Sequence, residues 1–326
     1  MAGKKRKSKK NKFPFLFYGI IILIVFWLCV GVFLFFQSKQ NLQASIYVYP
    51  ENPKQGDTVF IKVESAAKQV VGKLGEEKIN FYKKTGTNEW ISFLGIDADQ
   101  TPGNFNIFAD TSNGEHLTKE INISLAGFSS APSVAAPSAG QTVITVSESV
   151  NNIITKDNPA INKILSNFTA EPYFNNPFSF PLNSIKISGF SFGKFIKFGK
   201  GKIQHLGVDL FAKENSNIYA VNDGKVVAVF NLPNYGKTVI IDHGLNIFSM
   251  YLHLDEFKVV SGDIVRRGQL VGLSGKTGYA AGPHLHFSMR VDGKRVDPLE
   301  FIKQTQQIND SSFTASITGG FLNFFK

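Results

Sequence analysis

The sequence has a single cysteine, Cys29, among its 326 residues. One cysteine excludes a disulfide within the chain. It also argues against a structural zinc site, because such sites are closed by four protein ligands that usually include cysteine. Cys29 lies in an uncharged apolar run, where we expect it to act as a small apolar side chain rather than as a redox group.

A strong basic field is missing from most of the chain. The formal net charge is +10, but seven lysine and arginine residues lie within residues 1–12, which leaves +3 for the remainder. Proteins that bind nucleic acid through charge need a basic patch on the folded body. The sequence therefore predicts no nucleic-acid partner.

A run of 24 residues without charge, Phe13 to Phe36, follows the basic residues. It is long enough to cross a bilayer core of about 30 Å. The alternative is a cleaved secretory signal, but Gln37 and the residues after it supply no small-residue cleavage site. We expect a cytoplasmic basic tail at 1–12 and a transmembrane helix at 13–36. The positive-inside rule then predicts a single-pass protein of the cell membrane, with its N-terminus cytoplasmic and the chain after Gln37 extracytoplasmic.

Residues 43–126 show short alternating segments separated by glycine and proline turns. Such a pattern is typical of β-strands. The segments are Ser45–Tyr49, 58–63, 78–82 and 104–108. They predict an immunoglobulin-like β-sandwich without the disulfide. We expect it to hold the C-terminal part of the chain away from the membrane or to bind an envelope protein partner.

Residues 127–142 are rich in serine, alanine and proline, which is typical of a linker. The segment 143–170 is predicted to be helical, with Asn158 as N-cap and Pro159 at the first helical position. We expect this segment to pack at the edge of the domain that follows it. The C-terminal tail, 306–326, receives no predicted role.

Five of the six histidines lie between His205 and His286. In a β-strand His284 and His286 share one face. His205 and Asp209 can meet only if the chain bends, and Gly207 allows this. With cysteine absent from the region, these residues favour a catalytic zinc site with an open coordination position. Such a metal acts as a Lewis acid on a carbonyl, which suits amide hydrolysis.

The same region contains alternating segments joined by glycine turns, at 218–221, 225–230, 238–242, 247–251 and 285–291. Asp223-Gly224 and Asp292-Gly293 are strong signals for hairpins. The predicted fold is therefore mainly β, an antiparallel sheet with the metal in a groove on one face. His243 and His116 are expected to be structural or exposed, and Gly275-Lys276-Thr277 is expected to be a surface turn.

Several motifs in this region resemble those of the lysostaphin-like, or LytM-type, zinc metallopeptidases. They are Ser188-Gly-Phe-Ser-Phe-Gly193, His205-Leu-Gly-Val-Asp209, Ala220-Val-Asn-Asp-Gly224, Ile241-Asp-His-Gly244, Tyr251-Leu-His-Leu254, Gly262-Asp263, Gly282-Pro-His-Leu-His-Phe287 and Val296-Asp-Pro298. The resemblance covers residues 171–305. It implies a zinc (Zn²⁺) site held by His205, Asp209 and His286, with His253 and His284 as catalytic residues acting on the water or the oxyanion.

Two positions depart from the family pattern. Ser288 stands where a carboxylate commonly follows the His-Leu-His-Phe motif, and Lys194 to Gly199 replace an arginine-containing turn. Neither change touches a predicted ligand.

The resemblance implies a membrane-anchored zinc metalloendopeptidase that hydrolyses peptide cross-links of bacterial peptidoglycan. The alternative is a non-catalytic, wall-binding or regulatory module that activates another wall hydrolase. Regulatory relatives tend to lose metal ligands, whereas this chain retains all three.

Overall fold

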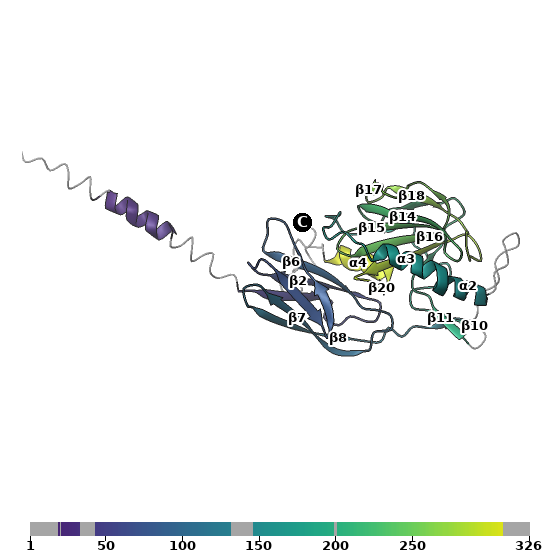
Figure 1. Cartoon of the computed structure of the whole chain (residues 1–326), viewed down its shortest axis with the longest axis horizontal. Helices are drawn as coiled ribbons and strands as arrows, with labels where there is room; N and C mark the ends of the chain where they lie inside the picture. Colours follow the sequence, from purple (N-terminus) through teal and green to yellow (C-terminus); the bar gives the residue numbers. More distant parts are fainter. Residues whose placement is uncertain (1–18, 20, 33–42, 132–145, 199–200, 309–326) are drawn as a thin grey trace, which may run out of the picture. The chain divides into compact units, whose positions relative to one another are not determined.

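The computed structural model describes residues 19, 21–32, 43–131, 146–198 and 201–308 (Figure 1). The chain forms two compact units, with the boundary after Ala44. In the first unit, residues 21–32 are helical. No helix within the described ranges is both long and apolar enough to cross a membrane. The predicted basic tail, the ends of the predicted span 13–36, most of the predicted linker and most of the predicted C-terminal tail lie outside the described residues.

Residues 45–123 form two antiparallel sheets of four strands. One sheet has the order β1 (Ser45–Tyr49), β2 (Thr58–Glu64), β6 (Glu89–Gly95), β5 (Tyr82–Lys83), and the other has the order β4 (Glu77–Asn80), β3 (Val70–Leu74), β7 (Gly103–Thr111), β8 (His116–Ile123). Side chains from both sheets share one core, where Ile61 of β2 lies with Ile107 of β7 and Ile121 of β8. The predicted antiparallel β architecture is confirmed, and the immunoglobulin-like assignment stays a prediction.

A nine-stranded antiparallel sheet carries the histidine-rich region. Its main path is β12 (Val208–Leu210), β19 (Leu285–Val291), β16 (Ile247–Phe257), β15 (Gly236–Asp242), β14 (Gly224–Leu232), β17 (Ile264–Val265), and the strands β13 (Asn217–Tyr219), β18 (Leu270–Ser274) and β20 (Lys294–Val296) pair beside it. Alternate side chains face opposite sides. Tyr251 and Phe287 enter the main core, whereas Met250 and Leu252 lie on the other face. That second face carries the candidate site.

A continuous helical segment precedes this sheet in the chain. It consists of α2 (Val146–Asn152), the π-helical turn η1 (Ile153–Asp157) and α3 (Asn158–Leu165). Ile161 packs on Met250 and Leu252, so α3 covers part of the second face of the sheet. The predicted N-cap at Asn158 is wrong, because Asn158 has helical backbone angles in mid-segment. The buried carboxylate of Asp157 instead accepts hydrogen bonds from the backbone N–H groups of Asn234 and Tyr235.

A small three-stranded sheet combines one strand that precedes the helical segment in the sequence with two strands that follow it. It contains β9 (Ser130–Ala131), β10 (Phe195–Phe198) and β11 (Gly201–Gln204), with β10 and β11 antiparallel and β9 parallel to β10. The segment that departs from the family pattern at 194–199 thus contributes strand β10.

One predicted hairpin is confirmed and one is wrong. Asp292 and Gly293 join β19 to β20 with φ of 50° and 76°, as a type I′ turn requires. Asp223-Gly224 forms no hairpin, because β13 pairs with β18 and β14 pairs with β15 and β17. Gly224 is instead a site of close packing, since a Cβ there would lie 2.6 Å from Ile241 and 2.7 Å from the Asp242 carbonyl oxygen.

The last described element is a helix that was not predicted from the sequence. Helix α4 spans Pro298–Gln307, and its N-cap Asp297 accepts from the N–H groups of Leu299 and Glu300. An Asp-Pro pair is the ordinary signal for such a start. Its final residues fall within the segment predicted as a tail.

Candidate metal centre and active site

Strand pairing brings two of the predicted ligands together. Asp209 on β12 lies directly opposite His286 on β19. His286 Nδ1 is 2.9 Å from Asp209 Oδ1, and His205 Nε2 is 3.1 Å from the same oxygen. His205 Nε2 and His286 Nδ1 are 3.0 Å apart. One ligand-type atom from each of the three residues therefore lies within 4.8 Å of the others.

Gly207 permits this convergence through its lack of a side chain. An added Cβ would lie 2.4 Å from Nε2 of His286 and 2.9 Å from the carbonyl oxygen of Phe287. The chain between His205 and Asp209 thus runs against the ligand imidazole, where only glycine fits. The predicted bend at Gly207 is present, and close approach rather than left-handed backbone is the reason for glycine.

The protonation of His205 leaves a conflict that a cation would resolve. Its Nδ1 lies 3.2 Å from the carbonyl oxygen of Ser191, which only accepts, so Nδ1 carries the proton of the neutral ring. Nε2 is then an acceptor, yet it faces a carboxylate oxygen at 3.1 Å. A second proton on His205 would relieve this one contact. A divalent cation would satisfy all three inward-facing atoms at once.

Electrostatics agree with this interpretation. Burial opposes ionisation of Asp209, but contacts with His205 and His286 outweigh it and hold the pKa of Asp209 well below its usual value. Burial lowers the pKa of His286, which favours the neutral ring that coordinates metals. Two imidazole nitrogens and one carboxylate oxygen are a donor set that suits zinc and leaves a coordination position open.

His253 reaches the site because β16 contains an irregularity there. Up to Leu252, β16 pairs with β19, and from Leu254 it pairs with β18. The register with β15 shifts at the same place, and His253 has a φ of 60°. Regular alternation would point His253 into the core with Tyr251, but the extra residue turns it to the second face and leaves Leu254 in the core.

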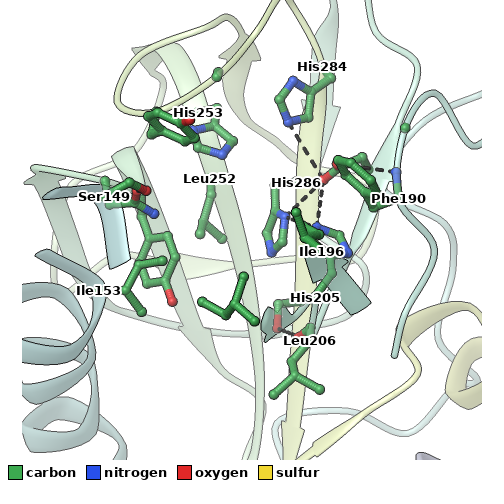
Figure 2. A pocket seen from close by; sticks show the side chains of 18 of the residues that line it. Ser149, Ile153, Phe190, Ile196, His205, Leu206, Leu252, His253, His284 and His286 are labelled. Carbon is green, nitrogen blue, oxygen red and sulfur yellow. Dashed lines mark hydrogen bonds and ion pairs between the residues drawn. The ribbon is translucent and has the colours of Figure 1, made fainter. Parts of the chain in front are cut away.

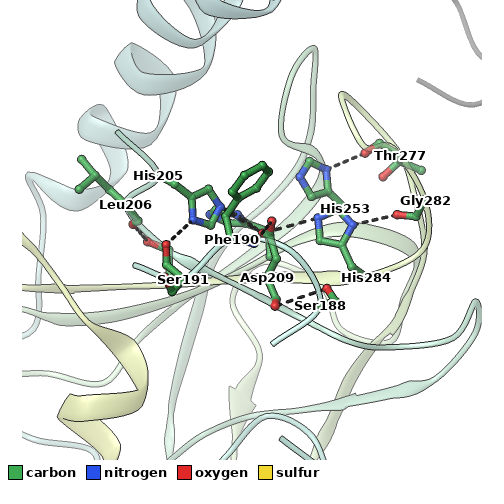
Figure 3. Close-up of polar contacts among 12 residues, drawn as sticks. Ser188, Phe190, Ser191, His205, Leu206, Asp209, His253, Thr277, Gly282 and His284 are labelled. Atoms are coloured by element: carbon green, nitrogen blue, oxygen red, sulfur yellow. Dashed lines mark hydrogen bonds and ion pairs between the residues drawn. The ribbon is translucent and has the colours of Figure 1, made fainter. Parts of the chain in front are cut away.

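His253 and His284 present the same ring nitrogen to the site (Figure 3). Nδ1 of His253 donates to the carbonyl oxygen of Thr277 at 2.8 Å, and Nδ1 of His284 donates to that of Gly282 at 2.8 Å. Each Nε2 is therefore left for other partners, and Nε2 of His284 lies 3.6 Å from Asp209 Oδ1. Burial, followed by the neighbouring His284 and His286, lowers the pKa of His253 to about 3, so its ring is neutral.

Several residues that support the site were not predicted. The carbonyl groups of Ser191, Thr277 and Gly282 orient three imidazoles. Thr277, expected in a surface turn, also accepts from Lys237 N and donates to the carbonyl oxygen of Leu254. The sequence offers one signal, the glycine directly after Thr277. Gly278 has a φ of 73°, and an added Cβ there would lie 2.4 Å from the carbonyl oxygen of Asn234.

Ser288 has a direct structural role at the position where the family carries a carboxylate. Its hydroxyl donates to the carbonyl oxygen of Leu206 at 3.0 Å. Leu206 lies between His205 and Gly207, so this bond ties the ligand-bearing loop to β19. The change from the family pattern therefore leaves a hydrogen bond that supports the ligands.

The imidazoles and the proposed ligands open onto one cavity of about 750 Å³, which we call the catalytic groove. Figure 2 shows Ser149 and Ile153 of the helical segment on the opposite side of the groove from His286 and His205. The segment predicted to pack at the domain edge therefore also forms a wall of the groove. Its position is fixed by Asp157 and by Asn158, which accepts from the Tyr235 hydroxyl at 3.0 Å.

The remaining histidines lie away from the groove. His243 is buried, with Nδ1 2.7 Å from Asp223 O and Nε2 2.8 Å from Ser249 Oγ, and burial lowers its pKa to about 4. His116 is exposed and lies 2.8 Å from Asp110 Oδ1. Both predictions of a structural or exposed histidine are confirmed.

The described residues thus combine an antiparallel β-sheet with a His-Asp-His cluster that could hold a metal ion and two further imidazoles that line the same groove. Comparison with known proteins gives the family. Residues 203–298 match the model of peptidase family M23, and this part of the chain is an M23 peptidase domain.

Individual relatives agree with this assignment. The chain is 34% identical over 120 residues to the peptidoglycan DD-endopeptidase ShyB of Vibrio cholerae, which covers 36% of this chain and 28% of that protein. It is 32% identical over 145 residues to the glycyl-glycine endopeptidase ALE-1 of Staphylococcus capitis, which covers 42% of this chain and 39% of that protein. The chain thus spans well under half the length of these relatives.

A solved structure shows a similar fold over a longer range. A crystal structure from Pseudomonas aeruginosa assigned to peptidase M23 has a TM-score of 0.57 and 23% identity. The match covers 77% of this chain and 95% of that chain. At this identity the likeness concerns the fold.

Proposed function

We propose that the chain is a membrane-anchored zinc metalloendopeptidase that hydrolyses peptide cross-links in bacterial peptidoglycan. The observation that carries the proposal is the convergence of His205, Asp209 and His286 within 4.8 Å beside two imidazoles with free Nε2 atoms. A site used only for binding has no need of two further imidazoles next to the proposed ligands. M23 membership and the activities named for ShyB and ALE-1 support the substrate class.

In this proposal His205, Asp209 and His286 would hold one zinc ion. When bound, zinc supplies a Lewis acid for hydrolysis of the peptide bond. The neutral ring of His253, fixed by Thr277, takes the proton of the attacking water at Nε2. Nε2 of His284 lies 3.6 Å from Asp209 Oδ1 and faces the same groove. We assign it to the oxygen on which negative charge develops, which it would contact through a hydrogen bond.

The groove suits an extended peptide. It is bounded by β19 on one side and by the helical segment on another, and Phe190 and Leu252 add apolar surface. An extended chain fits beside strands and a helix without having to fold back. We therefore propose a peptide within a cross-link as the substrate, with the scissile bond beside His253 and His284.

Anchoring in the membrane is part of the proposal. Its support is the uncharged run Phe13 to Phe36 directly after seven basic residues. In intact cells with any outer barrier opened, added protease should cleave beyond Gln37 and spare the basic tail. A mature chain that begins near Gln40 would instead indicate a cleaved signal.

The decisive experiment combines metal analysis with digestion of purified cell walls. The full chain is expected to bind close to one zinc per molecule and to release cross-link fragments. Asp209→Ala should lose most of the zinc, because a charged ligand is removed. A zinc-loaded chain that binds walls of several cross-link types, releases nothing and stimulates a separate hydrolase would establish the regulatory alternative.

A further inference from the structure

Two arginines lie at the end of the catalytic groove away from the imidazoles. On β19, His286, Ser288 and Arg290 share the groove face, because Phe287 and Met289 between them enter the core. Arg295 on β20 lies directly opposite Arg290, and both arginines line the groove. Arg290 lies four residues after His286 on the same strand. At a rise of about 3.3 Å per residue, the two positions are about 13 Å apart.

Arg290 is buried, and one of its nitrogens has no partner. Only 6% of Arg290 is exposed, and its buried Nε has no hydrogen-bond partner. Among the residues that the structure describes, no carboxylate lies within ion-pair distance of Arg290 or Arg295. Burial, and then the nearby Arg295, lowers the pKa of Arg290 to about 9, which leaves it charged at neutral pH.

The neighbouring cation shows the ordinary arrangement. Lys294, next to Arg295 on β20, forms an ion pair with Glu77 at 2.9 Å. An unpaired charge in a buried place is unfavourable, and proteins ordinarily neutralise such a group or pair it. Two guanidinium groups that face the groove, with no carboxylate of the described residues within ion-pair distance, are therefore suited to an anion that enters with a ligand. A planar guanidinium matches a carboxylate with two parallel hydrogen bonds.

We propose that Arg290 and Arg295 form a subsite for a carboxylate of the peptide substrate. This inference rests on the proposed function, since the same groove holds the imidazoles and the proposed metal ligands. An extended peptide advances about 3.3 Å per residue, so the bound carboxylate lies about four residues from the scissile bond. The arginines thereby select acidic peptides and fix their register in the groove.

The test is a binding measurement with peptides that cannot be cleaved. In each, the bond expected to be cut is a reduced amide, and a glutamate is placed two to six residues away on either side. Every peptide has a partner with glutamine at the same position, which keeps the shape and removes the charge. Calorimetric titration of the full chain gives the Glu-to-Gln ratio of affinities at each position.

At one position near four residues, glutamate should bind about 10-fold to 100-fold more tightly than glutamine, as expected for charge-assisted hydrogen bonds. Arg295→Gln should bring this ratio close to one. Arg290→Gln should have the same effect if this variant folds. Because Arg295 is only half-buried, Arg295→Gln is expected to fold and provides the test even if Arg290→Gln does not. The control Lys294→Gln keeps the wild-type ratio, because Lys294 is engaged with Glu77.

Several results would overturn the subsite: equal affinity for glutamate and glutamine at every position, no binding of any peptide, or an unchanged ratio in Arg295→Gln. Cleavable versions of the same peptides separate this inference from the proposed function. Preference for glutamate without any cleavage would reject the endopeptidase and keep the subsite. Cleavage without preference would reject the subsite and keep the endopeptidase.

Discussion

Gly207→Ala offers a direct test of the metal centre, because it changes no proposed ligand. The added Cβ would lie 2.4 Å from His286 Nε2 and 2.8 Å from Cε1, whereas ordinary contacts begin at 3.4 Å. The imidazole must therefore retreat by about 1 Å, and the Phe287 carbonyl oxygen at 2.9 Å stops the new methyl from moving aside. Zinc ligands tolerate displacements of only about 0.2 Å.

We expect Gly207→Ala to weaken zinc binding by at least about 100-fold, because His286 is moved out of coordinating range. The crowding should also lower the free energy of unfolding of the metal-free chain by about 1 to 3 kcal/mol. Competition with a chromophoric chelator measures the first effect, and urea unfolding in the presence of a strong chelator measures the second.

Gly282→Ala is the matched control. Gly282 lines the same groove, but an added Cβ there meets nothing within 4 Å, so zinc affinity should stay at the wild-type value. Wild-type zinc affinity in Gly207→Ala would refute the reasoning, since it would mean that His286 is not a ligand. Equal losses in both variants would point to a general effect of replacing glycine.

Three further predictions concern the imidazoles and two buried groups. His253→Ala and His284→Ala should each slow fragment release by about 10² to 10⁴ while zinc content stays unchanged; loss of zinc in both would mean that the wrong histidines were assigned to the metal. The pKa of His243 is about 4 in the fold against 6.5 in the unfolded chain, so the free energy of unfolding should fall by about 3 kcal/mol as pH decreases from 6.5 to 4. Urea unfolding across this range should show a flatter profile for His243→Gln, and an unchanged profile would show that His243 does not titrate as described. Arg290→Met should raise the free energy of unfolding by about 1 kcal/mol or more in the absence of ligand, whereas Lys294→Met should change it by less than about 1 kcal/mol.

The sequence predicted several of the longer strands but missed β6 (Glu89–Gly95) and β8 (His116–Ile123). In Leu285–Val291 and Gly236–Asp242 the apolar side chains occur often enough to reveal the period of a half-buried strand. Strands of two or three residues, such as β12 and β17, contain too few positions to show any period. They form because neighbouring strands offer hydrogen-bonding partners, which is a property of the assembled sheet.

In the candidate site, too, some residues could be predicted from the sequence and others could not. His205, Asp209 and His286 were predicted as ligands from motifs, and the structure places the three together. The carbonyl groups that orient the rings could not be predicted, because every residue has a carbonyl and its direction depends on the fold. The unpaired state of Arg290 was equally hidden, since a sequence shows charges but not which of them lack partners.

His253 shows most clearly why the site needs the whole fold. An alternating pattern assigns residue 253 to the core side, with Tyr251, and a buried histidine there would have to be neutral and paired. The change of partner strand after Leu252 inserts one extra residue, and the φ of 60° at His253 is the local consequence. Such a backbone costs a non-glycine residue about 1 kcal/mol or more, and it persists only where surrounding contacts hold it. Here those contacts are β18 on one side and the Thr277 carbonyl on the other, so the loop between β18 and β19 supports the His253 imidazole.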